Sequence, residues 1–265
     1  MKCMWRVVGW LALLVLPARA GNLPAMVVVT EDARPLHYLW QGQLQGEAPQ
    51  FVQQLMRRAG LHYSQQVYPW ARAYMMAGSL PNVLIYSMAR TPEREPQFHW
   101  IGKLLTVQYA MYALQGRSDI RARSVDELRA YRIGVTASDV RANWLRDQGL
   151  RDASADSRAG LDVADDSLSN LRKLMQGRVD MVPTSAVGLK SFCQSEGVDC
   201  SRFRRVMVLP FSVDLYLAAS LKTAPPAVAS LRRAYDSMVR DGRHHQILAP
   251  YLDSSEYALV TGKVK

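Results

Sequence analysis

Cysteine and histidine, the residues that hold most transition metals, are scarce in this chain. There are 3 cysteines and 5 histidines among 265 residues, and no two histidines are four positions apart, the spacing that would place both on one face of a helix. His244 and His245 are adjacent, so in a helix they point about 100° apart and do not easily share a metal. Cys193 and Cys200 have no further cysteine or histidine near them at ligand spacing. The sequence therefore predicts no metal site.

Short motifs of catalysis and nucleotide binding are missing too. The chain has no G-x-S-x-G elbow, no phosphate-binding glycine loop and no dinucleotide fingerprint. Hydrolases, NTPases and dehydrogenases thus have little support, and no cofactor is expected. The formal net charge is +10, but the basic residues are scattered among acids, without the dense stripe and stacking aromatics of a nucleic-acid surface. We expect a modest bias toward anionic ligands and no nucleic-acid partner.

A long uncharged apolar run occurs at the N-terminus and does not recur along the chain. Val7 to Leu16 follows a basic start and precedes the small-x-small sequence that ends at Ala20, as in a secretory signal peptide. A membrane anchor is the alternative, but ten apolar residues interrupted at Pro17 fall short of the roughly 20 that cross a bilayer. We expect a signal peptide at 1–20 and a soluble periplasmic protein after its removal.

Export places the remaining cysteines in an oxidising compartment. Cys3 leaves with the signal peptide, whereas Cys193 and Cys200 stay in the mature chain. A disulfide that closes a short loop is the usual outcome for such a pair. We predict that bond from the compartment, with two free thiols as the alternative.

The mature chain of about 245 residues is long enough for two modest domains. Apolar, β-rich runs predict strands at 25–30, 63–67 and 82–87. An apolar face predicts a helix at 48–60, which Gly60 is placed to end. Strand, helix and strand in succession indicate a parallel sheet covered by helices.

A second unit of the same kind starts near Ser118. Its expected elements are a short helix after a capping box at 124–127, a strand at 132–136, a helix that Ser138 opens and Gly149 closes, a helix at 168–175 and a strand at 179–183. This unit is flanked by two long, β-rich and nearly uncharged segments, 104–114 and 206–220. We expect these segments to carry the chain into the second lobe and back.

The sequence therefore predicts an α/β protein with two lobes. Lobe one is expected to hold 21–107, lobe two to hold 108–213, and the remainder, 214–265, to return to lobe one. An amphipathic helix at 227–242 is expected in that last part.

Several segments resemble a known family. The passage SMARTPEREPQFHWIGKL at 87–104, the opening TEDARPLHY, the Tyr68-Pro69-Trp70 sequence and the closing LRRAYDSMVRDGRHHQIL are similar to the extracellular solute-binding proteins of the polar-amino-acid type (family 3) of ABC importers. The resemblance implies a type II periplasmic-binding-protein clamp, each lobe a sheet flanked by helices, with two crossover strands as the hinge. It also implies a monomer that closes on a small polar ligand and docks on an ABC permease or a sensory receptor.

The resemblance assigns ligand-binding roles in lobe one. Arg94 matches the arginine that grips a ligand carboxylate, for which the two-pronged guanidinium is well suited; a surface salt bridge to Glu93 or Glu95 is the alternative. Other cations placed by motifs are Arg90, at the same cleft edge, and Arg141. Candidates for the aromatic walls of the pocket, or for ordinary core residues, are Trp70 and Tyr38.

In lobe two, Thr136 and Ser138 match the loop whose backbone N–H groups bind ligand oxygens at a helix start, although the loop also suits a simple helix cap. Thr184 and Ser185 stand where family members that bind α-amino acids commonly have a carboxylate for the ammonium group. Because burial of an unpaired ammonium is costly, an ordinary amino-acid ligand is in doubt, unless Glu31 or Asp32 supplies the charge.

An enzyme on the same fold is the main alternative. A periplasmic dehydratase that acts on cyclohexadienyl substrates shares this architecture, and fold does not settle function. Such an enzyme needs a general acid near the leaving hydroxyl, for which the candidates are Glu31, Asp32 and Asp214. We expect a binding protein rather than an enzyme.

Overall fold

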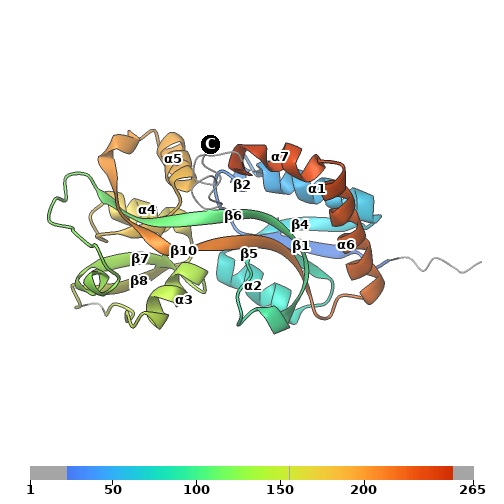
Figure 1. Cartoon of the computed structure of the whole chain (residues 1–265), viewed down its shortest axis with the longest axis horizontal. Coiled ribbons are helices and arrows are strands. Elements are labelled where there is room, and N and C mark those ends of the chain that lie inside the picture. Colours follow the sequence, from blue (N-terminus) through green and yellow to red (C-terminus); the bar gives the residue numbers. More distant parts are fainter. Residues whose placement is uncertain (1–22, 155, 253–265) are drawn as a thin grey trace, which may run out of the picture.

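The computed structural model describes residues 23–154 and 156–252, and two lobes lie end to end in it (Figure 1). The expected signal peptide at 1–20 lies outside the described residues. Two long strands, β6 (Phe98–Leu114) and β10 (Phe203–Ser220), run antiparallel through both lobes. The predicted crossing segments 104–114 and 206–220 lie within these strands. The proposed lobe boundaries, at 107–108 and 213–214, fall midway along them.

Lobe one is built on the parallel strands that the sequence predicts. Strands β1 (Met26–Thr30), β4 (Tyr63–Val67) and β5 (Val83–Ala89) are parallel, and the sheet continues through β10 and β6 in the order β4-β1-β5-β10-β6. Helix α1 (Glu47–Ala59) ends at Gly60, which has φ +66°. Glycine adopts this left-handed conformation without steric cost because it has no Cβ atom.

Helices cover both faces of the lobe-one sheet. On one face, α1 packs with α6 (Pro225–Arg240) and α7 (Arg243–Leu252) in a core that contains Phe51, Leu231 and Leu248. On the other face lies α2 (Trp70–Ser79), which the sequence analysis missed. The hairpin of β2 (Tyr38–Trp40) and β3 (Gln43–Gln45) was not predicted from the sequence either.

Lobe two repeats the alternation of strand and helix. Strands β7 (Arg132–Thr136) and β8 (Gly160–Ala164) are parallel, and β9 (Val182–Thr184) pairs with β6. The helices are α3 (Val140–Asp147), α4 (Ser167–Met175) and α5 (Ala186–Glu196). Short 3₁₀ segments lie at Glu95–Gln97, Asp126–Ala130 and Cys200–Arg202.

The start of α3 differs from the prediction. Asp139, not Ser138, is the N-cap, because its carboxylate accepts a hydrogen bond from the backbone N–H of Arg141 at 2.8 Å. Ser138 instead has φ +58°, in the left-handed region. The last strand of this lobe is also shifted by a few residues, since the predicted 179–183 is β9 at Val182–Thr184.

Cys193 and Cys200 form a disulfide, as the sequence predicts. It joins the end of α5 to the 3₁₀ segment Cys200–Arg202. Because the loop between the cysteines is short, the chain-entropy model gives a stabilisation of about 2 to 3 kcal/mol.

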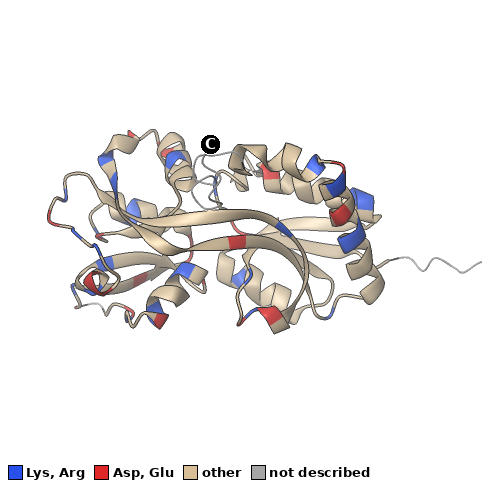
Figure 2. Ribbon diagram, in the orientation of Figure 1, with Lys and Arg blue, Asp and Glu red and all other residues tan. Residues whose placement is uncertain are grey.

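Charges are mixed over both lobes, with basic and acidic residues scattered among one another (Figure 2). Within residues 23–154 and 156–252, no helix has the length and apolar character needed to span a membrane. The same part of the chain contains no group of three His, Cys, Asp or Glu side chains placed to hold a metal ion.

Candidate functional site

A cavity of about 150 Å³ lies between the lobes. Its polar and aromatic lining from lobe one comprises Glu31, Asp32, Arg34, His37, Trp70, Ser87, Arg94, Thr106 and Tyr251. The polar and aromatic lining from lobe two comprises Gln108, Tyr109, Asp139, Arg141, Ser167, Thr184 and Ser185. Pockets for drug-sized ligands span roughly 300 to 1,000 Å³, so this cavity suits a smaller molecule of about amino-acid size.

Arg94 is buried in the cavity wall, with only 5% of its surface exposed. Its Nη1 donates to the carbonyl oxygen of Ala89 at 3.2 Å, and its Nη2 donates to that of Ser138 at 3.0 Å. The guanidinium also lies over the rings of Trp70 and Tyr74, 5.6 and 4.8 Å from their centroids. No carboxylate forms an ion pair with Arg94 among the described residues, so the alternative of a salt bridge to Glu93 or Glu95 is not what the structure shows.

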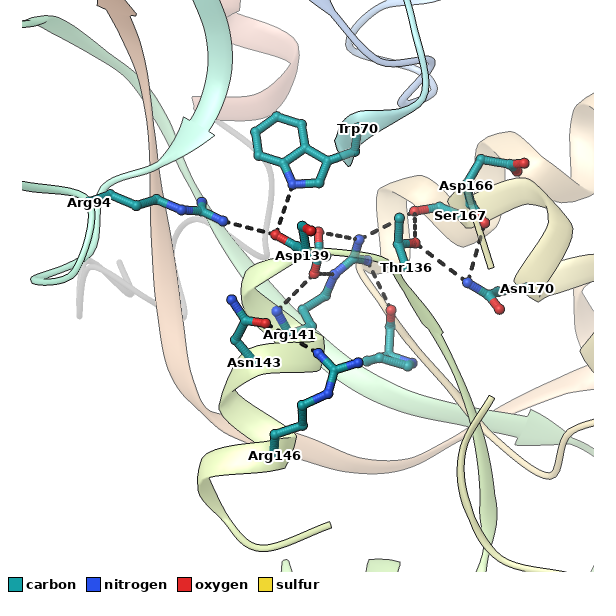
Figure 3. Close-up of polar contacts among 12 residues, drawn as sticks. Trp70, Arg94, Thr136, Asp139, Arg141, Asn143, Arg146, Asp166, Ser167 and Asn170 are labelled. Carbon is teal, nitrogen blue, oxygen red and sulfur yellow. Dashed lines mark hydrogen bonds and ion pairs between the residues drawn. The ribbon is translucent and has the colours of Figure 1, made fainter. Parts of the chain in front are cut away.

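The carbonyl oxygen of Ser138 joins the two lobes. It accepts from Arg94 and also from Nε1 of Trp70, the first residue of α2, at 3.0 Å (Figure 3). We call this carbonyl and its two donors the interlobe latch. The left-handed backbone of Ser138 costs energy, and such strain often marks functional sites. Ser138 thus contacts lobe one through its carbonyl oxygen. The sequence predicted instead that its backbone N–H group binds a ligand oxygen.

Arg90 and Tyr38 do not line the cavity. Arg90 forms two hydrogen bonds to the carboxylate of Glu95, at 2.7 and 2.6 Å, and it is partly exposed. The ring of Tyr38, in β2, packs beneath the guanidinium of Arg34 at 4.6 Å. Both residues are close in sequence to residues that line the cavity, but their side chains contact Glu95 and Arg34 instead.

Lobe two contributes a buried ion pair that the sequence analysis did not identify. Arg141 binds both carboxylate oxygens of Asp139, with Nε–Oδ1 at 2.6 Å and Nη2–Oδ2 at 3.0 Å (Figure 3). Arg141 also donates to the carbonyl oxygen of Pro183 and packs on the ring of Tyr109. The available signal was the Asp-x-Arg spacing at a helix start, which places an N-cap carboxylate beside a cation two residues later.

Opposing effects act on the pKa of Asp139. Burial by itself raises it, but the charge and hydrogen bonds of Arg141 outweigh burial, so the pKa falls below its ordinary value of 3.8. Both side chains are therefore charged and neutralise each other. The pair gives the cavity fixed polar groups and little net charge.

The remaining lobe-two residues are held mainly by their own lobe. The Thr136 hydroxyl lies 3.3 Å from the Ser167 hydroxyl and accepts from Asn170 at 3.4 Å, behind the cavity. Ser185 caps α5 by accepting from the backbone N–H of Gly188 at 3.0 Å. Thr184, which is buried, lines the cavity as the last residue of β9.

Glu31 is the acid with the most perturbed environment in the cavity. Its pKa is raised to about 8, chiefly by burial and then by the nearby charge of Asp139, while Arg141 lowers it. Its Oε2 is buried and accepts no hydrogen bond from the described part of the chain. Asp32, by contrast, has a hydrogen-bond donor, because its Oδ2 accepts from the backbone N–H of Leu39 at 3.2 Å. Asp214 lies outside the cavity lining, where it pairs with Lys103 at 2.7 Å.

His37 and Ser87 also line the cavity, and the sequence analysis missed both. His37 is fully buried, which lowers its pKa to about 4, so the ring is neutral. Its Nδ1 lies 2.9 Å from the carbonyl oxygen of Glu31. Ser87 has φ +59°, and its hydroxyl has no hydrogen-bond partner within 23–154 and 156–252. A buried histidine and a strand serine look like core residues in a sequence, so no signal singled them out.

No protein-family model matches the chain, and a sequence comparison with curated proteins found no match. Solved structures do match it. A histidine kinase sensor domain with similarity to periplasmic binding proteins has a TM-score of 0.75 at 15% identity, covering 87% of this chain and 97% of that one. An ancestral arginine-binding protein bound to arginine has a TM-score of 0.72 at 16% identity, covering 86% and 97%.

A third match is the arginine-, lysine-, histidine-binding protein ArtJ of the thermophilic bacterium Geobacillus stearothermophilus. Its TM-score is 0.71 at 16% identity, and the match covers 87% of this chain and 96% of that one. At such identities the likeness is one of fold. It confirms the two-lobed architecture that the sequence predicts.

Proposed function

We propose that this chain, which has the periplasmic-binding-protein fold, is a solute-binding protein that captures a small polar, carboxylate-bearing ligand by closure of its lobes. The observation that carries the proposal is a cavity lined by both lobes, with the buried guanidinium of Arg94 in its wall. Closure brings Arg94 and Trp70 of lobe one against Ser138 of lobe two. A clamp of this kind encloses its ligand by hinge motion.

The unneutralised charge of Arg94 supports an anionic ligand. Guanidinium has five N–H donors, and the described residues accept from Arg94 through two carbonyl oxygens. A buried cation without a countercharge is costly. A ligand carboxylate would supply that charge and would accept charge-assisted hydrogen bonds from the remaining N–H donors of the guanidinium.

Delivery after capture is either to an ABC importer or to a sensory receptor. The likeness to binding proteins supports the first partner, and the likeness to a kinase sensor domain supports the second. We propose that the ligand is captured in the periplasm, after removal of the signal peptide at 1–20.

Ligand addition should stabilise the protein and close it. The probes are the twenty L-amino acids and aliphatic carboxylates of two to six carbons. At 100 times its Kd, a true ligand contributes about 2.7 kcal/mol, which raises the Tm by roughly 5 to 11 °C for a chain of this size. The radius of gyration from small-angle scattering should fall with the same probe. If no probe in the panel raised the Tm or reduced the radius of gyration, the result would count against the proposal.

A cyclohexadienyl dehydratase-like activity is the second candidate, and one observation favours it. With a pKa of about 8, Glu31 is protonated at neutral pH inside the cavity, as a general acid must be. We nevertheless expect no aromatic product when the purified protein is incubated with a cyclohexadienyl acid and followed by ultraviolet absorbance. Product that forms with the wild-type protein and disappears with Glu31→Gln would establish the enzyme instead.

A further inference from the structure

Glu31 stands at the interface of the two lobes. It directly follows β1 of lobe one and lines the interlobe cavity. Its Oε2 is buried and accepts no hydrogen bond from residues 23–154 and 156–252. Buried polar atoms are nearly always paired, and an ionised carboxylate without a donor is especially costly to bury. The closed arrangement is therefore unfavourable for the charged form of this side chain.

Lobe two faces Glu31 with two carboxylates that are fixed in place. Asp139 is the N-cap of α3, where it accepts from the backbone N–H of Arg141 at 2.8 Å. Asp166 is the N-cap of α4, where it accepts from the backbone N–H of Ser169 at 2.7 Å. Each carboxylate already occupies the positive end of its helix, so neither helix end is free to stabilise a charge on Glu31.

The interlobe latch brings these groups together. Its acceptor, the carbonyl oxygen of Ser138, belongs to the residue before Asp139 (Figure 3). The hydrogen bonds from Trp70 and Arg94 to that carbonyl thus hold the start of α3 against lobe one. When a hinge motion opens the latch, water reaches Glu31, and Asp139 moves away with lobe two. The surroundings of Glu31 hence differ between the open and the closed form.

The arginines that line the cavity do not neutralise Glu31. They are Arg34, Arg94 and Arg141. Arg141 binds both carboxylate oxygens of Asp139, Arg34 lies 3.6 Å from the carboxylate of Asp32, and Arg94 donates to two backbone carbonyl oxygens. No hydrogen bond joins any of the three to Glu31 within the described ranges. A proton is then the means by which the closed protein neutralises this carboxylate.

The pKa of Glu31 agrees with this geometry. Burial is the main cause of its rise to about 8, Asp139 adds to the rise, and Arg141 opposes it without cancelling it. The neighbouring rings carry no compensating charge, because burial lowers the pKa of His37 to about 4 and raises that of Tyr109 to about 12. The closed form thus holds a neutral Glu31 at pH 7, whereas a glutamate in contact with water is ionised.

We propose that closure of the lobes takes up one proton at Glu31, so that mildly acidic surroundings favour capture of the ligand and alkaline surroundings favour its release. The inference rests on the lobe closure that is part of the proposed function, and it does not depend on which ligand is bound. Glu31 acts as a positioning residue, because its proton removes the charge that opposes contact between the lobes.

The sign and size of the effect follow from proton linkage. The closed form binds the proton more tightly than the open form. The equilibrium constant for closure therefore falls as the pH rises from 4.5, the ordinary pKa, toward the closed-form pKa of about 8. Between pH 6 and pH 8 the expected decrease is about 50-fold. Well below pH 4.5 both forms are protonated and well above pH 8 both are ionised, so the dependence disappears at either end.

Small-angle scattering of the unliganded protein tests this inference. The radius of gyration should increase between pH 6 and pH 9 as the lobes open. Glu31→Gln, which keeps the shape of the neutral acid, should have the same radius at both pH values as the wild-type protein has at pH 6. Asp214→Asn, which changes an acid outside the cavity lining, is the control and should open with pH as the wild-type protein does.

Carbon NMR of protein labelled at the glutamate carboxyl groups gives an independent readout, since the chain has seven glutamates. The resonance that is absent from Glu31→Gln should titrate with a midpoint well above the ordinary 4.5. Trp70→Phe removes one donor of the latch and should therefore lower that midpoint by at least about one pH unit, because water then reaches the carboxyl group.

A radius of gyration that is the same at pH 6 and pH 9 in the wild-type protein would overturn the inference, as would an opening that persists in Glu31→Gln. A raised midpoint that Trp70→Phe leaves unchanged would also contradict it, because the shift would then arise within lobe one alone. No ligand enters these measurements. Failure of every probe in the binding panel would thus contradict the proposed function without changing the outcome here.

Discussion

Replacement of Arg94 by alanine is expected to weaken binding of the tightest carboxylate probe by at least about 30-fold. Removing one partner of a desolvated charge pair costs on the order of 2 to 5 kcal/mol, and about 1.4 kcal/mol corresponds to a factor of ten in Kd. The same change removes one donor of the interlobe latch and leaves the carbonyl oxygen of Ala89 without its partner. Calorimetric titration measures the loss.

Three variants separate the causes of that loss. Arg94→Lys keeps the charge but not the two-pronged geometry, so it should also bind poorly. Trp70→Phe removes the other donor of the latch and keeps the ring, so its effect reports on closure without loss of the cation. Arg90→Gln should bind normally, because Arg90 pairs with Glu95 outside the cavity. Wild-type affinity in Arg94→Ala would show that the carboxylate assignment is wrong.

Loss of the Asp139 carboxylate is expected to have the largest effect on stability. Asp139→Ser can still cap α3, but it leaves the buried guanidinium of Arg141 without a countercharge. Breaking a buried pair in this way costs about 3 to 5 kcal/mol. Urea denaturation followed by circular dichroism measures the free energy of unfolding.

The double variant Asp139→Ser/Arg141→Met is the matched control. Replacing both members of a buried pair is often close to neutral, so it should be more stable than Asp139→Ser. If the single variant were as stable as the wild-type protein, the ion pair would not contribute to the free energy of unfolding.

The ion pair also has a pH signature. The folded pKa of Asp139 lies below its ordinary value of 3.8, so its stabilisation is present above that value and is lost as pH falls below it. Glu31 acts in the opposite direction. Its folded pKa of about 8 exceeds the ordinary 4.5, so its contribution in the empty protein is complete below pH 4.5 and declines as the pH rises toward 8.

Sequence patterns predicted the elements that local rules determine. The parallel strands of lobe one, helix α1 with its terminal Gly60 and the two crossing strands all carry strong apolar patterns, and all are present. Helix α2 was missed because it begins after Pro69 without a side-chain cap. The cap of α3 was assigned one residue early because Ser138 and Asp139 are both good N-cap residues, and only the backbone angles distinguish them.

The candidate site was less predictable because it depends on which way side chains point. Arg94 and Trp70 were found through a resemblance and lie in the cavity wall. Arg90 is four residues from Arg94, but its salt bridge to Glu95 directs it elsewhere. The buried setting of His37 follows from packing against Tyr86, a contact between residues almost fifty positions apart.

The position of β10 between β5 and β6 has a consequence for the order of folding. Ala89 in β5 pairs with Leu215 in β10, so the sheet of lobe one stays divided until most of the chain is available for folding. Lobe two lies within that interval and forms from contacts that are closer in sequence. Long-range pairing is the slow part of folding, and unpaired strand edges invite aggregation in the meantime. The lobe that emerges first should therefore finish folding last, and β5 should depend longest on protection by chaperones.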